Sequence, residues 1–223
     1  MNVHSPTCML STEKTSLLRH IVSQLREHAP FTFAGMLIGI LIMAGFVVGE
    51  VPHQVSRTLF WTFHPLHVLL SAQVTAAMFW LHGTRRFLPI LVVGYLGSVG
   101  IATLSDSLLP YLGEWLLGLP NRGIHLGFIE KPWLVNPLAL AGIWLGCRWP
   151  KTRFSHAGHV LLSTWASLFH ITLSFGGRPD VFTVIILAAT LFFSVWIPCC
   201  TSDIIFPLLF IKRRPRAGHA TPA

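Results

Sequence analysis

Two histidines three residues apart occur twice in this 223-residue chain, each pair followed by a serine four residues later. The residues concerned are His64, His67 and Ser71 in the first set, and His156, His159 and Ser163 in the second. On a helix this spacing places the three side chains within about 60° of one face. A neutral imidazole is a good ligand for Zn, Cu, Fe or Ni, so each histidine pair predicts half of a metal site.

A Ser-Asp pair follows each histidine motif further along the chain. A carboxylate within an apolar segment is costly unless it is paired, hydrated or coordinated, so we expect the two aspartates to complete the ligand sets. The predicted metal ligands are His64, His67, Asp106, His156, His159 and Asp203. The expected supporting polar residues are Ser71, Ser105, Ser163, Ser202, Cys199 and Cys200. The alternatives are histidines that bond a neighbouring helix and Ser-Asp pairs that cap a short helix before a proline.

These motifs belong to a longer internal repeat. The shared residues that precede the histidines are Pro30, Ala34, Gly35 and Gly39 in one copy and Pro137, Ala141, Gly142 and Gly146 in the other. Matching landmarks in the same order predict two structural halves. Cys199-Cys200 stands where the first half has Ala102-Thr103, so the cysteines are not part of what the halves share.

The composition indicates the elements that position these residues. With 52% hydrophobic and 11% charged residues and a mean hydropathy of +0.63, the chain is far more apolar than a soluble domain. We expect an all-α, polytopic integral membrane protein with six transmembrane helices. The predicted spans are Phe31 to Val51, Trp61 to His82, Phe87 to Pro110, Trp133 to Cys147, Phe154 to Phe175 and Val181 to Ile211.

Three spans per half imply a 3+3 inverted repeat, because a unit with an odd number of crossings inserts its second copy upside down. The expected segments are residues 1–29 as a cytoplasmic N-terminal amphipathic surface helix, 30–112 as the first repeat and 113–132 as an extracytoplasmic connection. Residues 133–211 form the second repeat and 212–223 a basic cytoplasmic tail.

The distribution of positive charge predicts the orientation. Of the 16 Lys and Arg residues, 12 fall in the segments that share a side with both termini, the others being Arg57, Arg122, Lys131 and Arg178. Both termini are therefore expected in the cytoplasm, with the chain in an inner or plasma membrane. The excess of basic over acidic residues then reflects contact with lipid headgroups, and no nucleic-acid partner is expected.

The depth of the motifs leaves two arrangements open. His156 follows closely on basic Arg153 and belongs near the cytoplasmic side, whereas inverted symmetry places His64 toward the opposite face. This favours two half-sites, one per leaflet. If Gly97, Gly100 and Pro198 break the third helix of each half, both sets could instead meet at one site. His170, His125 and Glu130 lie outside the repeat and carry less weight.

The leading functional hypothesis is a small permease for a divalent transition-metal cation, with the repeated motifs lining the route. The alternatives are an intramembrane enzyme or redox protein that holds a metal or a haem, and a non-catalytic subunit of a larger membrane complex. An anion permease is a further alternative. The expected partners are the lipid bilayer, the metal ion, and a second copy or a partner membrane subunit.

Overall fold

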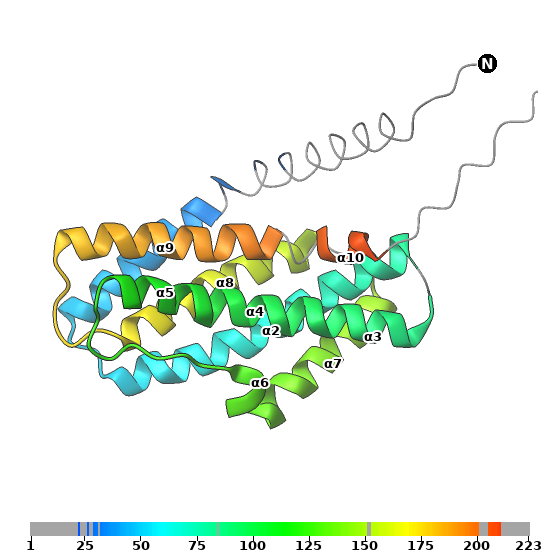
Figure 1. The fold of residues 1–223 in the computed structure, drawn as a ribbon, viewed down its shortest axis with the longest axis horizontal. Helices are drawn as coiled ribbons and strands as arrows, with labels where there is room; N and C mark the ends of the chain where they lie inside the picture. The colour runs from blue at the N-terminus through cyan, green and yellow to red at the C-terminus, as the bar shows by residue number, and fades with distance from the viewer. Residues whose placement is uncertain are drawn as a thin grey trace, which may run out of the picture.

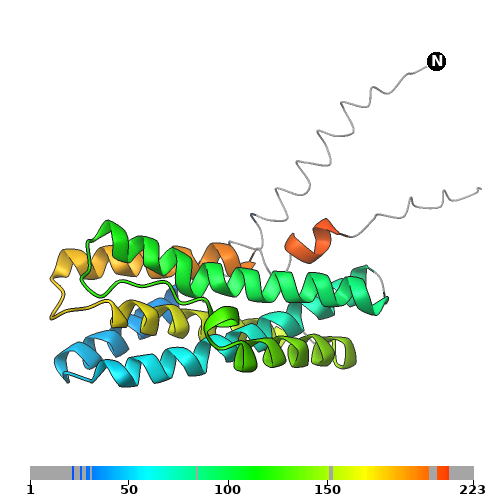
Figure 2. The same cartoon turned by 60° about the horizontal axis from the view of Figure 1, so that its bottom comes forward.

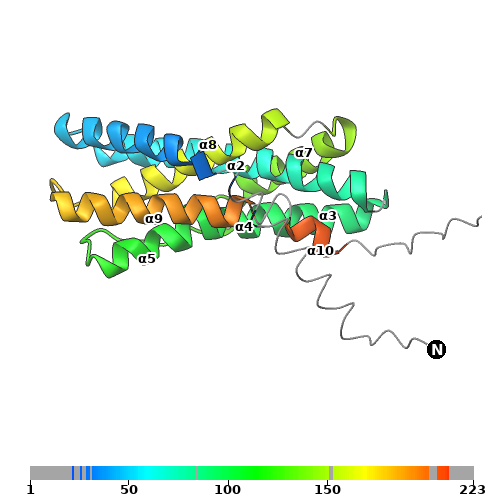
Figure 3. The same cartoon turned by 90° about the horizontal axis from the view of Figure 1, so that it is seen from above.

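The prediction of an all-α protein is confirmed by a computed structural model, which describes residues 22, 26, 29–30, 32–83, 85–150, 153–200 and 205–210, with the backbone alone for 153–156, 200 and 208. The longer helices lie along one another in an elongated bundle (Figure 1). The same parallel arrangement is seen after rotation about the long axis (Figures 2 and 3).

Three helical stretches make up the first half. They are Thr32–Val48, α2 (His53–His82) and the continuous run Phe87–Leu116. The second stretch begins eight residues before the predicted start at Trp61, and the third continues six residues beyond the predicted end at Pro110. The third stretch therefore enters the segment that was expected to form the connection.

The break at Gly97 and Gly100, which was one of the two arrangements left open, does not occur. The run Phe87–Leu116 stays helical, and it passes through α3 (Phe87–Tyr95), the π-helix η1 (Leu96–Gly100), α4 (Ile101–Thr103), the π-helix η2 (Leu104–Leu108) and α5 (Leu109–Leu116). A Cβ atom at Gly97 would lie 2.9 Å from side-chain atoms of both Thr75 and Phe206, so close packing explains this glycine. Wider π turns replace the break, and such turns often occur at functional sites.

The second half begins after a short helix, α6 (Gly127–Glu130), and consists of α7 (Pro132–Arg148), α8 (Arg153–Leu173) and α9 (Val181–Cys200). Of the last predicted span, the structure describes α9 and a short helix, α10 (Phe206–Leu209), and residues 201–204 between them lie outside the described residues. The predicted surface helix and basic tail lie outside the described residues, apart from positions 22, 26 and 29.

Two of the described helices, Phe87–Leu116 and Val181–Cys199, are long and apolar enough to cross a membrane by length and composition. Thr32–Val48 is apolar but shorter. Only 28% of the most apolar window of Val181–Cys199 is buried inside the protein. Large apolar side chains are exposed along these helices, including Phe33, Leu41, Val92, Leu96, Phe182, Ile185 and Phe193.

Matched glycines pack the two halves together through reciprocal contacts. A Cβ atom at Gly35 would lie 3.6 Å from Thr164 and 3.9 Å from Leu161, both on α8. Its counterpart Gly142 packs directly on Leu69 and Ala72 of α2. Leu69 and Leu161 each lie five residues after the first histidine of their motif, and Ala72 and Thr164 each lie eight residues after it. The first helix of each half thus packs on the same positions of the other half's second helix.

The apolar cores also join the first helix of each half to helices of the other half. One core joins the first helix of the first half to α8 and α9, through residues that include Met36, Leu168 and Leu191. Another joins the first helix of the second half to α2 and α3, through Ile143, Ala76 and Ile90. The second helices, α2 and α8, pack closely against each other in the middle of the bundle.

The glycine contacts predict unequal effects of the same substitution. We expect Gly142→Ala to destabilise the protein by about 1–3 kcal/mol, because the added methyl group would overlap the backbone of α2. Gly45→Ala is the matched control, since a Cβ atom there meets nothing within 4 Å and alanine favours the helix by up to about 1 kcal/mol. Denaturant unfolding in detergent measures both, and equal stabilities would contradict the packing account.

Candidate metal centre

Two histidines from one face of α2 share a single carboxylate oxygen. The Nδ1 atoms of His64 and His67 lie 2.9 and 2.7 Å from Oδ2 of Asp106. Asp106 is in the π-helix η2, and all three side chains are buried. The spacing of the histidines on α2 therefore aims both rings at the acidic residue that the sequence pairs with them.

The other oxygen of Asp106 accepts hydrogen bonds from two serines. The hydroxyl groups of Ser105 and Ser163 lie 2.7 and 2.8 Å from Oδ1. Ser163 comes from α8, so this contact joins the two halves. Ser167, one turn further along α8, donates to the backbone carbonyl of Ser105 at 3.0 Å. Four donors from three helices thus satisfy a carboxylate with an exposed fraction of 0%.

This arrangement determines which ring nitrogens carry protons. An ionised carboxylate only accepts hydrogen bonds, so His64 and His67 each donate their Nδ1–H to Asp106. The Nε2 atom of a neutral ring then keeps its lone pair. His67 Nε2 is buried and has no hydrogen-bond partner among the described residues. Its lone pair is therefore available to a metal ion.

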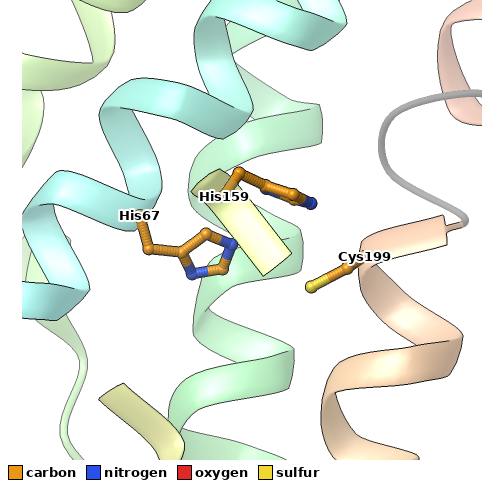
Figure 4. Close-up of side chains that lie close together, drawn as sticks. All are labelled: His67, His159 and Cys199. Carbon is orange, nitrogen blue, oxygen red and sulfur yellow. The ribbon is translucent and has the colours of Figure 1, made fainter. Parts of the chain in front are cut away.

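His67 converges with two side chains of the second half. The ligand atoms of His67, His159 and Cys199 all lie within 4.8 Å of one another, and the three side chains are fully buried. They come from α2, α8 and α9 and point toward a common space (Figure 4). The rings of His67 and His159 are 4.9 Å apart between centroids. The group could hold a metal ion.

The donor set suits a borderline or soft cation. Two imidazoles and one thiolate are ligands that Zn²⁺ accepts, and the thiolate also favours Cu⁺. Around a tetrahedral zinc ion such ligand atoms lie roughly 3.3–3.6 Å apart. Because the three ligand atoms all lie within 4.8 Å of one another, they would need to move closer together by at most about 1 Å to bind such an ion.

In the described part of the structure, some residues of each predicted half-site lie together in one cluster. His64, His67, Ser105 and Asp106 of the first half meet His159, Ser163 and Cys199 of the second half. Ser71 is buried in α2. The side chains of His156 and Cys200, and the residues Ser202 and Asp203, lie outside the described part of the structure.

The structure contains a second buried acid, which was not among the residues predicted from the sequence. Glu114 of α5 is fully buried, and its Oε1 lies 2.9 Å from Nδ1 of His170 on α8. Ser107 Oγ lies 3.5 Å from the other ring nitrogen of His170 and accepts a hydrogen bond from the backbone N–H of His125. The available signal was an acidic residue near the end of an apolar segment, which is a costly placement without a partner.

Replacement of the shared carboxylate should destabilise the protein. We expect Asp106→Asn to cost on the order of 3 kcal/mol, because an amide opposes two imidazole and two hydroxyl donors with one acceptor and adds a donor of its own. Asp180→Asn is the control, because this exposed residue bonds the backbone N–H of Thr183 and asparagine caps a helix equally well. Unfolding curves of the two variants that coincide would contradict this account.

The connection before α6 should be sensitive to acid. Burial, followed by the neighbouring His170, lowers the pKa of His125 below its ordinary value of 6.5. The unfolded chain therefore takes up this proton first, so stability is complete above about pH 6.5 and is lost as the pH falls through the folded-state pKa. We expect His125→Gln to lose less stability than the wild type between about pH 7 and pH 5.

The control for this prediction is His82→Gln, at the exposed end of α2. Unfolding midpoints measured across the pH range test it, and a His125→Gln profile parallel to that of the wild type would contradict it.

No family model matches the chain, and no curated protein or solved structure is similar enough to match it. Its function is therefore inferred from the buried side chains.

Proposed function

We propose that this protein is a small membrane permease for a transition-metal cation, which binds at His67, His159 and Cys199. The observation that carries the proposal is the convergence of these three fully buried ligands from three helices. Their imidazole and thiolate groups surround one point, as the ligands of a single metal ion do. The axial ligands of a haem would instead approach from two opposite faces.

Asp106 has a different role in this proposal from the one expected of it as a ligand. Its two oxygens already accept four hydrogen bonds. It orients His67 and increases the basicity of the ring, as carboxylates do behind metal-binding histidines. His64, which shares the same oxygen, completes the support of the carboxylate.

The proposed membrane location is supported by the exposed apolar helices. Val181–Cys199 is long enough to cross a membrane, and only 28% of its apolar window is buried inside the protein, which favours an apolar environment around the rest. The six-span orientation with both termini in the cytoplasm, and a homodimer or partner subunit, remain predictions from charge and from helix number.

Reciprocal packing supports an inverted repeat. In a two-fold arrangement, a contact between residue i of one unit and residue j of the other recurs with the units exchanged. Gly35 and Gly142 follow this rule. A residue that touches its own counterpart lies near the axis, as His67 and His159 do. An ion held there sits between two halves whose exchange of conformation could open the site to either side.

A metal-dependent membrane enzyme is the second candidate. Three protein ligands leave one coordination position of a tetrahedral ion open, which is the arrangement of catalytic zinc sites. In an enzyme, a substrate or a water molecule would occupy the open position. In a permease, a ligand that binds the ion only while it moves through the protein would occupy it.

Metal binding tests the site directly. Purified protein titrated with Zn²⁺, and with Cu⁺ under reducing conditions, should bind about one equivalent, and Cys199→Ala should weaken binding at least about 100-fold because it removes the thiolate of the three-residue group. Alanine is the residue that the first half has at this position, so the fold should be retained. Cys147→Ala, in α7, is the matched control and should bind normally.

Transport distinguishes the two candidates. Vesicles of phosphatidylethanolamine and phosphatidylglycerol that contain wild-type protein should take up radioactive zinc, and vesicles with Cys199→Ala should not. Binding without uptake would remove the permease and leave the enzyme. Equal binding by wild type and Cys199→Ala would contradict the site itself.

A further inference from the structure

A second buried carboxylate lies outside the metal centre, and its charge is balanced by fewer close hydrogen-bond donors than that of Asp106. Glu114 has an exposed fraction of 0%. Its oxygens face the ring of His170 at 2.9 Å and the backbone N–H of Gly123 at 3.4 Å. Asp106 has four donors within 2.9 Å. Among the described residues Glu114 has a single close donor, and a buried acid with so little compensation is costly as an anion, so adding one proton to the pair would lower this cost.

The partner of Glu114 has a second nitrogen that can take this proton. His170 is 2% exposed, and its Nδ1 donates to Glu114. The Ser107 hydroxyl, 3.5 Å from Nε2, already accepts the backbone N–H of His125 at 2.8 Å. Its own proton is thus free to point at His170, which leaves Nε2 as the acceptor.

A line of titratable side chains leads from this pair to the surface. The rings of His170 and His125 lie edge to face, 5.3 Å apart. His125 Nδ1 is 3.2 Å from Oε2 of Glu130, and the two side chains are 20% and 40% exposed. Ring nitrogens that point along the line between these two centroids would lie about 3 Å apart, which is within hydrogen-bond range.

The other charged groups nearby do not belong to this line of titratable side chains. On α2, Phe60 packs against the rings of both His64 and His170, so it contacts the Asp106 cluster as well as the pair. In addition to burial and His170, the positive charge of Arg57, which is also on α2, lowers the pKa of His125. The ammonium group of Lys131 lies over the Trp61 ring, 4.5 Å from its centroid. Neither Thr32–Val48 nor Val181–Cys199 contributes a charged side chain.

From these contacts we propose that Glu114 and His170 form a buried proton-binding site, which exchanges protons with water through His125 and Glu130. The site is separate from the metal centre and does not depend on it. In the loading step, the proton leaves the His125 imidazolium and binds Nε2 of His170. Glu114 stays ionised and pairs with the imidazolium that forms, so the buried pair becomes neutral overall.

Nuclear magnetic resonance of metal-free protein with ¹⁵N-labelled histidines tests the equilibrium. We expect the ring nitrogens of His170, assigned from loss of the signals in His170→Asn, to change with pH between about pH 4 and pH 9. Glu114→Gln should shift that transition to lower pH, because the compensating charge is gone. Thermal unfolding verifies that both variants fold, and Glu130→Gln should leave the equilibrium transition in place.

The rate of proton uptake after a pH jump tests the route. His125→Phe should slow protonation of His170 at least about tenfold with a retained equilibrium transition, because phenylalanine fills the space without carrying a proton. A purely structural role of His125 would leave the rate unchanged. The proposal is overturned if His170 does not titrate, if Glu114→Gln titrates as the wild type does, or if His125→Phe takes up protons at the normal rate.

Discussion

The central constraint on this bundle is the Asp106 carboxylate, which has no access to water. An ion removed from water costs several kcal/mol unless protein donors replace the hydration. The structure supplies two imidazoles from α2, a serine from its own helix and a serine from α8. To satisfy this group the three helices must keep a definite register. The same hydrogen bonds hold the His67 ring in one orientation and one tautomer, which prepares it to face the metal centre.

Close approach of the helices makes that register possible. Gly142 and Gly146 let α7 lie directly on α2, where side chains would hold the backbones apart. Gly35 and Gly39 face α8 more loosely, since a Cβ atom at either position would lie 3.6 Å from its nearest side-chain atom there. With the first helix of each half packed on the other half, α2 and α8 are left facing each other, and His67 meets His159 between them.

The two buried carboxylates differ in a way that suits different tasks. Asp106 has enough donors to remain ionised and rigid, as a group that orients metal ligands should. Glu114 has one close donor among the residues that the structure describes, and it belongs to a line of side chains that reaches the surface. The Phe60 ring contacts a histidine of each set. The bundle thus combines a preorganised site and a titratable one within a few helical turns.

The histidine and Ser-Asp motifs could be read from the sequence because their spacing matches the helical period and because they occur twice. Repetition also pointed to two halves, and composition to apolar helices. The boundaries were less predictable, since Gly97 marks a close contact and not a break. Glu114 and Ser107 were missed because their partners, His170 and His125, are 56 and 18 residues away along the chain.

By itself, the sequence determined which residue types could bind a metal and which helix face carries them, because helical spacing is a local property. Only the tertiary structure decided that His67, His159 and Cys199 meet at one point and that Asp106 supports the ring behind them. The reason is that these contacts join helices distant in the chain, whose register depends on side-chain packing and on the hydrogen bonds that a buried charge requires.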